Sequence, residues 1–450
     1  MNLINLILSY TMVLSASMAQ PAQNSEHKLY TAKNSSEATM KFSHWVEMQS
    51  MRPPTTEMAR EQIERQLTHL FGPMSNHPHP AVPRGDHKLR IYKPKMIAED
   101  SYRISYNYSG TIVLKNGPNQ FYEILLPNNP DEIYQKGFSG EINPCTDEHY
   151  QAEGDFWYFW NPFQKDCPLK EENDFSRIKA EIVRKTNQSN SFPDYARLLR
   201  STKDQNYEIP IRIFLGMDDP TNLQNPNQSK DINAGTFLTI RNFLITNKYK
   251  KTGLELSTHP ALQNIKRNKM GYLEEYRKTL TSNNGRKVDI SIELYFGPTG
   301  IQESSKTFHY LFKNSIEAGS VLIYDGHSGL GGHLDIGSIE SLENFKIQFN
   351  QNQYQIFYFN SCSSYPYYNT MFFEQKKSVL DPKGTLNLDI LTNGLATYFS
   401  VLEDSSLALV TAIEYWVSGK AVISYQQLAQ KIDSGNLFGI NGDEDNPKTP

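Results

Sequence analysis

The second half of the chain contains two residues that could carry out nucleophilic chemistry. His327 comes shortly after the apolar run 321–324, and Cys362 comes shortly after the apolar run 354–359. A cysteine thiolate is the nucleophile, and an imidazole beside it can stabilise the thiolate and later protonate a leaving group. The carboxyl ends of adjacent parallel strands meet at one edge of a sheet, where sites in α/β proteins form. The separation of 35 residues (362 − 327) leaves room for a crossover connection, so the sequence predicts a His327–Cys362 pair of a cysteine hydrolase.

The segment that carries His327 is rich in glycine. Gly326 and Gly329 flank it, and glycine lets a substrate approach the backbone closely. Backbone N–H groups near Ser328 and at Cys362 could bind the negative oxygen that develops when a carbonyl group is attacked. We therefore expect these backbone groups to contribute to an oxyanion site.

The same residues allow three other interpretations. His333 could replace His327, although it lies further from the end of the strand. A serine hydrolase with Ser328 as nucleophile is a second alternative, but the segment does not match the G-x-S-x-G turn that it needs, because Leu330 stands where the last glycine is required. Cys362 could also be a core residue at a strand end, in which case His327 is only a turn residue.

The cysteine content separates a structural pair from a single thiol. Cys145 and Cys167 flank the aromatic segment 156–160 and are 22 residues apart (167 − 145), so they form the natural disulfide pair. Closing a loop of that length stabilises a fold by about 3 kcal/mol in the chain-entropy model. Cys362 is then left alone, and a leftover cysteine in an exported protein is either buried and inert or a reactive thiol.

The elements that must position the predicted pair alternate between strands and helices. Short apolar runs typical of buried strands are separated by helical patterns, which favours a mostly parallel sheet covered on both faces. The expected strands are residues 209–215, 288–296, 321–324, 354–359 and 386–391, and the expected helices are residues 234–249, 306–317, 406–417 and 425–432.

The first half of the chain has a different pattern. A helix is expected from Thr55, which can cap it, to residue 71. The run 102–114 alternates between apolar and polar residues, and a turn at 115–117 predicts a hairpin with the return strand 121–126. With residues 178–183 as another strand, this part is predicted to be a smaller β-rich α+β domain.

These patterns predict the following division of the chain. A polar stretch at 201–206 is the best boundary between the two halves. We expect a polar N-terminal segment with a helix at 20–100, a β-rich domain at 101–205, an α/β domain at 206–436 and a disordered acidic tail at 437–450.

The N-terminus resembles a signal peptide at residues 1–19. The apolar run 3–14 is too short to span a bilayer, and Ser17-Met18-Ala19 resembles a cleavage site. Because no Lys or Arg precedes the run, a buried N-terminal helix is the alternative. We expect an exported protein, periplasmic or extracellular, with no membrane insertion after the signal is removed.

Composition limits the partners and cofactors. The 45 basic and 49 acidic residues give a net charge of −4, which offers no general reason to expect nucleic acid as a partner. Three histidines, His77, His79 and His87, lie in a proline-rich stretch without regular ligand spacing, so we expect a solvated loop. The acidic residues 443–445 are likewise expected in solvent rather than around Ca²⁺. No metal or cofactor is predicted, and the sequence does not indicate an oligomeric state.

Around the predicted pair, the sequence resembles the clan of cysteine peptidases that includes caspases, metacaspases, legumain, clostripain and the gingipains. In that clan a strand ends in a glycine-rich His motif, and the next strand ends in a small residue followed by the catalytic Cys. The matching text here is VLIYDGHSG around His327 and IFYFNSCSS around Cys362, within a resemblance that covers residues 207–435. Ser328 stands where the clan usually has Gly, and Ser363-Ser364 follow Cys362.

The resemblance implies a caspase-like fold and a role for each site residue. Cys362 would be the nucleophile and His327 the acid/base residue, and the reaction would pass through a thioester with a protein or peptide substrate. The segment Gly326, Ser328 and Gly329, with Asn360 before the nucleophile, would support the oxyanion. Asp325 and Asp389 could polarise the imidazole, but the clan usually works with two residues, so both stay unassigned. The alternative function is a non-catalytic secreted binding protein on an inactive peptidase-like scaffold.

Overall fold

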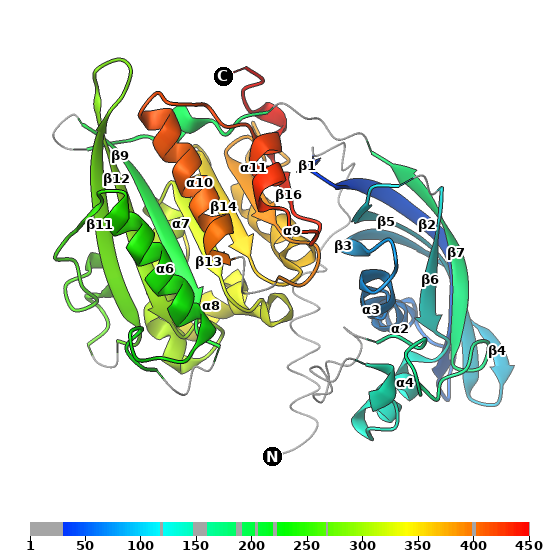
Figure 1. Ribbon diagram of the computed structural model, residues 1–450. Helices are drawn as coiled ribbons and strands as arrows, with labels where there is room; N and C mark the ends of the chain where they lie inside the picture. Colours follow the sequence, from blue (N-terminus) through cyan, green and yellow to red (C-terminus); the bar gives the residue numbers. More distant parts are fainter. Residues whose placement is uncertain are drawn as a thin grey trace. The chain divides into compact units, whose positions relative to one another are not determined.

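In a computed structural model, the chain forms two compact units (Figure 1). The smaller unit is Asn34–Thr186, and the larger unit combines Met1–Lys33 with Asn187–Pro450. The predicted signal peptide at 1–19 lies outside the described residues. The structure describes residues 30–117, 120–146, 160–185, 191–202, 206–218, 223–266, 269–397 and 402–449.

The larger unit contains a sheet whose central strands are parallel, as the sequence predicted. The strand order is β1-β16-β15-β14-β13-β9-β12-β11-β10, and the run from β15 to β12 is parallel throughout. The parallel strands are β9 Tyr207–Gly216, β12 Lys287–Gly297, β13 Val321–Asp325, β14 Gln355–Asn360 and β15 Leu388–Thr392. Antiparallel strands complete the sheet: β1 Tyr30–Ala32, β8 Arg200–Ser201, β10 Lys250–Lys251, β11 Tyr272–Thr281 and β16 Gly439–Asn441.

Helices cover both faces of this sheet because neighbouring residues of each central strand point into different apolar cores. In β13, Ile323 belongs to the core that includes α6, α10 and α11, while Tyr324 belongs to the core of α7, α8 and α9 (Figure 1). These helices are α6 Ile232–Thr246, α7 Lys306–Ala318, α8 Ile336–Glu343, α9 Ser364–Lys376, α10 Leu402–Val417 and α11 Tyr425–Ile432.

The prediction of a disordered tail at 437–450 is wrong. Strand β16 pairs with both β15 and β1, so part of this segment belongs to the sheet. The reason is that Phe438 and Ile440 are completely buried ahead of the acidic run. Asp443 is also buried, where it accepts hydrogen bonds from Thr31 Oγ1 at 2.7 Å and from Ser191 Oγ.

The smaller unit is an antiparallel sheet with the strand order β3-β5-β2-β7-β6. The predicted hairpin is therefore wrong, because β6 pairs with β7 and the neighbours of β5 are β3 and β2. The strands are β2 Ser35–Gln49, β3 Ala81–Ile91, β4 Lys95–Ala98, β5 Ser101–Lys115, β6 Phe121–Pro127 and β7 Phe175–Arg184.

Strand β2 explains why the division of the chain differs from the predicted one. It alternates between buried residues such as Met40 and exposed ones such as Lys41, and it lies at the centre of the sheet that we expected to begin at residue 101. The boundary expected at 201–206 instead falls inside the larger unit, where β8 pairs with β9. The smaller unit therefore begins and ends earlier than predicted.

Helix α2 Thr56–Thr68 packs on the sheet of the smaller unit and begins where the sequence predicted. The Thr55 Oγ1 atom accepts the Met58 N–H at 3.2 Å, which caps the helix. Among its described residues, this unit also has α3 Phe71–Ser75, α4 Pro130–Phe138 and the 3₁₀ turn η1 Asn143–Cys145. The larger unit has the 3₁₀ turns η3 Tyr195–Leu198, η4 Pro260–Leu262, η5 Glu303–Ser305, η6 Gly329–Leu334 and η8 Asp443–Asp445. Over the described residues, none of the helices has the length and apolar character needed to span a bilayer.

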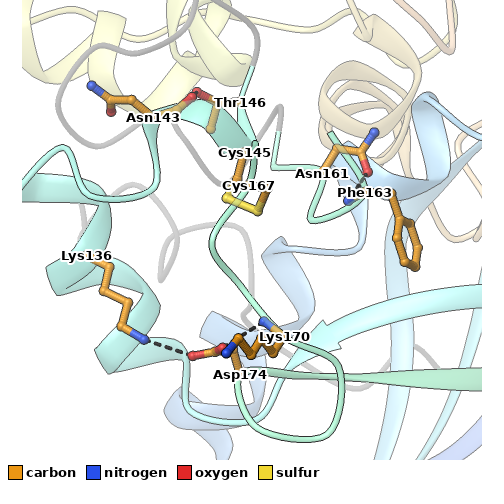
Figure 2. Close-up of a disulfide and its surroundings, with 9 residues drawn as sticks. All are labelled: Lys136, Asn143, Cys145, Thr146, Asn161, Phe163, Cys167, Lys170 and Asp174. Atoms are coloured by element: carbon orange, nitrogen blue, oxygen red, sulfur yellow. Dashed lines mark hydrogen bonds and ion pairs between the residues drawn. A yellow bond between two sulfur atoms is a disulfide. The ribbon is translucent and has the colours of Figure 1, made fainter. Parts of the chain in front are cut away.

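A disulfide joins Cys145 to Cys167, as the sequence predicted (Figure 2). Cys145 is completely buried in a small core with Trp160 and Phe175. Nearby, the Lys136 ammonium and the Lys170 N–H both donate to Asp174 at 2.8 Å (Figure 2). The covalent link therefore closes a loop whose base is also held by packing and by charge-assisted hydrogen bonds.

Candidate functional site

Strand register brings the two predicted catalytic residues to the same edge of the large sheet. Strands β13 and β14 are adjacent and parallel, and their last residues, Asp325 and Asn360, are partners in the register. His327 and Cys362 each follow two residues later. Both side chains therefore leave the sheet at the carboxyl ends of neighbouring strands, where α/β proteins form their sites.

His327 is paired with a carboxylate that the sequence analysis did not identify. The His327 Nε2 atom lies 2.8 Å from Asp218 Oδ1. Asp218 follows the end of β9 by two residues, and β9 is the other parallel neighbour of β13. With 42% of the His327 side chain and 57% of the Asp218 side chain exposed, both remain open to a substrate. The Asp218 N–H donates to Asp231 Oδ2 at 2.8 Å, which helps to fix the turn.

The signal for Asp218 was present in the sequence. The rule that selected His327 and Cys362, a polar residue just beyond the carboxyl end of a parallel strand, applies equally to the strand that ends at Gly216. Applied to every predicted strand, this rule would have found Asp218.

The glycines on either side of His327 lie in closely packed surroundings. A Cβ atom on Gly326 would lie 3.2 Å from the Gly216 Cα and 3.0 Å from the Tyr324 hydroxyl oxygen. Gly329 has a φ of +53°, and a Cβ there would lie 2.1 Å from the His333 ring. Glycine is therefore strongly favoured at position 329, whereas a side chain at position 326 would need its neighbours to move by a few tenths of an ångström.

Cys362 lies between the end of β14 and the start of α9, and its side chain is half-buried. The Thr397 N–H donates to the Cys362 Sγ at 3.4 Å, and the thiol faces the Thr397 carbonyl oxygen at 3.9 Å. Burial raises the pKa of the Cys362 thiol, and the hydrogen bond with the Thr397 backbone opposes this only in part. The resting side chain is therefore a neutral thiol at neutral pH.

Asn360 supports the site from within the core. It is buried, and its Oδ1 atom accepts a hydrogen bond from Asn393 Nδ2 at 3.0 Å. The same Asn393 nitrogen donates to Thr397 Oγ1 at 2.8 Å. Asn360 thus connects the end of β14 to the segment whose backbone contacts the Cys362 thiol.

Asp325 and Asp389 make their contacts away from His327, whereas the His333 imidazole is hydrogen-bonded to the His327 backbone. Asp325 is buried and accepts a hydrogen bond from Ser406 Oγ at 2.7 Å. Asp389 lies near the beginning of β15, where its register partner is Ile356, so it is at the opposite edge of the sheet from Cys362. Burial lowers the pKa of His333 to about 4, which keeps that imidazole neutral above this pH.

The three histidines of the proline-rich stretch do not converge. His77 and His79 have ring centroids 6.2 Å apart, whereas His87 Nε2 lies 2.8 Å from a Glu64 carboxylate oxygen. Throughout the ranges that the structure describes, His, Cys, Asp and Glu side chains form no group of three or more able to hold a metal ion.

Chemically, the sheet edge combines a thiol, an imidazole held by a carboxylate, and a glycine-rich loop beside them. A thiol and an imidazole can transfer an acyl group, and the carboxylate can orient the imidazole and stabilise its charged form. The site is built from the ends of three adjacent strands, β9, β13 and β14. The sequence matches no protein-family model and no curated protein.

Proposed function

We propose that this chain is an exported cysteine hydrolase, an endopeptidase of the caspase-like clan, with Cys362 as nucleophile and His327 as acid/base residue. The observation that carries the proposal is the register of β13 with β14, which gives both residues the same position beyond adjacent strand ends. The sequence motifs around the two residues and the carboxylate on His327 support it independently.

In the proposed reaction, Asp218 holds Nε2 of His327, so the proton exchange with the thiol uses Nδ1. Because burial raises the thiol pKa, His327 acts as a general base while Cys362 Sγ attacks the substrate carbonyl. A carbon–sulfur bond forms, and the imidazolium then gives the proton to the leaving amine as the carbon–nitrogen bond breaks. Water hydrolyses the resulting thioester with His327 again as base.

Acetyl transfer from p-nitrophenyl acetate tests the proposal without knowledge of the natural substrate. At pH 7 we expect Cys362 to be acetylated faster than a free cysteine, as mapped by mass spectrometry. His327→Ala should reduce this rate by about 10²-fold or more, because the neutral thiol loses its base. A peptide library digested by the protein would then show whether the bond cleaved is a peptide bond. Acetylation of Cys362 at the rate of a free thiol, unchanged in the His327 variant, would overturn the proposal.

The raised thiol pKa predicts the pH dependence of alkylation. Iodoacetamide reacts with the thiolate and needs no acid or base, so its rate with Cys362 should follow the thiolate fraction. Because burial raises the pKa from 9.0, we expect the rate to climb about tenfold per pH unit from pH 7 to beyond pH 9. Labelling across pH 6 to 11 checks this. A plateau reached below pH 8 would instead indicate a resting thiolate–imidazolium pair.

Asp218 should matter for the acyl transfer but not for the fold. We expect Asp218→Asn to lower the acetylation rate of Cys362 by about tenfold, since the imidazolium loses its charged partner on a largely exposed contact. Asp289→Asn is the matched control: this carboxylate is bonded to Thr279 on the next strand. Equal rates for the wild type and the two variants would remove Asp218 from the site.

A non-catalytic binding protein is the second candidate, and one observation favours it. Cys362 is half-buried and its sulfur contacts a backbone N–H and a carbonyl oxygen, as an inert core thiol would. In that case Cys362→Ala would leave the biological function unchanged, and a partner would be expected to bind the smaller unit.

A further inference from the structure

Two buried tyrosine hydroxyls hold consecutive carbonyl groups of the loop that carries His327. The Tyr324 hydroxyl donates to the His327 carbonyl oxygen at 2.7 Å, and the Tyr368 hydroxyl donates to the Ser328 carbonyl oxygen at 3.0 Å. Both tyrosine side chains are completely buried. A carbonyl oxygen can only accept, so the single hydroxyl proton of Tyr324 goes to the His327 carbonyl. Thr299 Oγ1, which lies 3.0 Å from the Tyr324 hydroxyl, then donates to that oxygen.

Because the peptide unit is planar, the direction of these two carbonyl groups also determines the direction of two N–H groups. The peptide bonds from His327 to Gly329 are trans, so each N–H points opposite to the carbonyl of the same peptide unit. When the carbonyls of His327 and Ser328 point at buried hydroxyls, the N–H groups of Ser328 and Gly329 point away from that core. Within the described ranges, neither of these N–H groups donates to a protein acceptor.

Tyr368 also connects the two halves of the site. It lies on α9, the helix that begins two residues after Cys362, whereas the carbonyl that it holds belongs to the loop after β13. The Ser328 carbonyl additionally accepts the N–H groups of Gly331 and His333, at 3.0 and 3.2 Å. These two bonds are local to the loop, whereas the Tyr368 bond ties the loop to the helix that follows Cys362.

We infer that Tyr324 and Tyr368 are positioning residues that aim the N–H groups of the His327 loop at the oxyanion of the substrate. The inference rests on the proposed function, because an oxyanion forms only if Cys362 attacks a carbonyl group. Preorganised N–H donors stabilise such a charge strongly, and small displacements of a catalytic group are costly. The serine after His327 is then compatible with activity, because the backbone of Ser328, rather than its side chain, is the donor.

Two reagents separate this role from a structural one. Acetylation of Cys362 by p-nitrophenyl acetate develops an oxyanion, whereas alkylation by iodoacetamide is a displacement that develops none. We expect Tyr324→Phe to lower the acetylation rate by about 10- to 100-fold and Tyr368→Phe by about 3- to 10-fold. The iodoacetamide rate, measured at pH 10, should change less than about twofold in both variants, and the urea unfolding midpoint confirms that each is folded.

Tyr295→Phe is the matched control. Tyr295 is buried in the same apolar core, and its hydroxyl lies 3.1 Å from the Met270 carbonyl oxygen and 3.4 Å from the Pro298 carbonyl oxygen, neither of which belongs to the His327 loop. We expect this variant to acetylate like the wild type. Equal acetylation rates in all three variants, or equal losses with both reagents, would overturn the role of the tyrosines. Failure of the wild type to acetylate Cys362, with normal alkylation, would overturn the proposed function instead. Tyr324→Phe and Tyr368→Phe are independent tests, so the proposal can be decided even if only one of them folds.

Discussion

Replacing Cys362 by alanine should lower kcat/KM for acyl transfer by at least about 10³-fold, because the proposed covalent intermediate forms on its sulfur. Cys362→Ser should be nearly as inactive, since a hydroxyl is far harder to ionise than a thiol and His327 therefore removes its proton much less readily. The measurement is turnover of p-nitrophenyl acetate or of a peptide that the library identifies, with the site of acylation confirmed by mass spectrometry.

Ser361→Ala provides the control for the Cys362 variants. Ser361 is the preceding residue, is buried and is of similar size, so its replacement perturbs the same strand end and leaves the Cys362 thiol in place. We expect its kcat/KM to stay within about threefold of the wild type. If Cys362→Ala retains the wild-type rate, the observed hydrolysis comes from other groups and Cys362 is a structural residue, as the binding-protein alternative requires.

The central sheet of the larger unit could be predicted because its strands are apolar on both faces. In β13 and β14 every residue is buried, so each strand appears in the sequence as a continuous apolar run between helical patterns. Helix α11 Tyr425–Ile432 was predicted to the residue, since Ser424 and Gln427 form a capping box at its start. Where local signals and burial agree, the sequence alone determines the element.

Strand pairing in the smaller unit could not be predicted from local signals. The turn after residue 114 favoured a hairpin, but β5 is already paired along its length with β2 and β3, so β6 joins β7 instead. Strand β2 was missed because its outward residues are polar and its ladder partners lie far away in the chain. Such pairing depends on competition among strands, which no single segment contains.

The candidate site was predictable to the same extent as the strands that hold it. His327 and Cys362 follow apolar runs, and register then places them together. Asp218 required the same rule at the predicted strand 209–215, where the rule was not applied, while the roles of Tyr324 and Tyr368 depend on loop geometry. The sequence pattern predicts that each tyrosine is a core residue. Only the structure shows to which carbonyl oxygen its hydroxyl donates.

The disulfide offers the largest expected effect on stability. Replacing both Cys145 and Cys167 by alanine should lower the free energy of unfolding of the smaller unit by about 3 kcal/mol, because the unfolded chain regains the freedom of a loop of 22 residues. For a unit of this size, the midpoint of urea unfolding should then fall by roughly 1 to 3 M. Tryptophan fluorescence follows this unit, since Trp45 and Trp160 lie in it and Trp416 lies in the other.

Cys362→Ala serves as the control for this double variant, since it removes a cysteine from the larger unit without opening the loop. Because Cys145 is buried beside Trp160, alanine there also leaves a small cavity, which adds to the loss. Reduction of the wild type avoids that cavity, so the difference between the reduced protein and the double variant isolates the packing effect. An unchanged midpoint in both cases, with three thiols titrating in the unreduced unfolded protein, would mean that the two cysteines are not joined. A single titrating thiol together with the expected loss would leave Cys362 as the one cysteine available for chemistry.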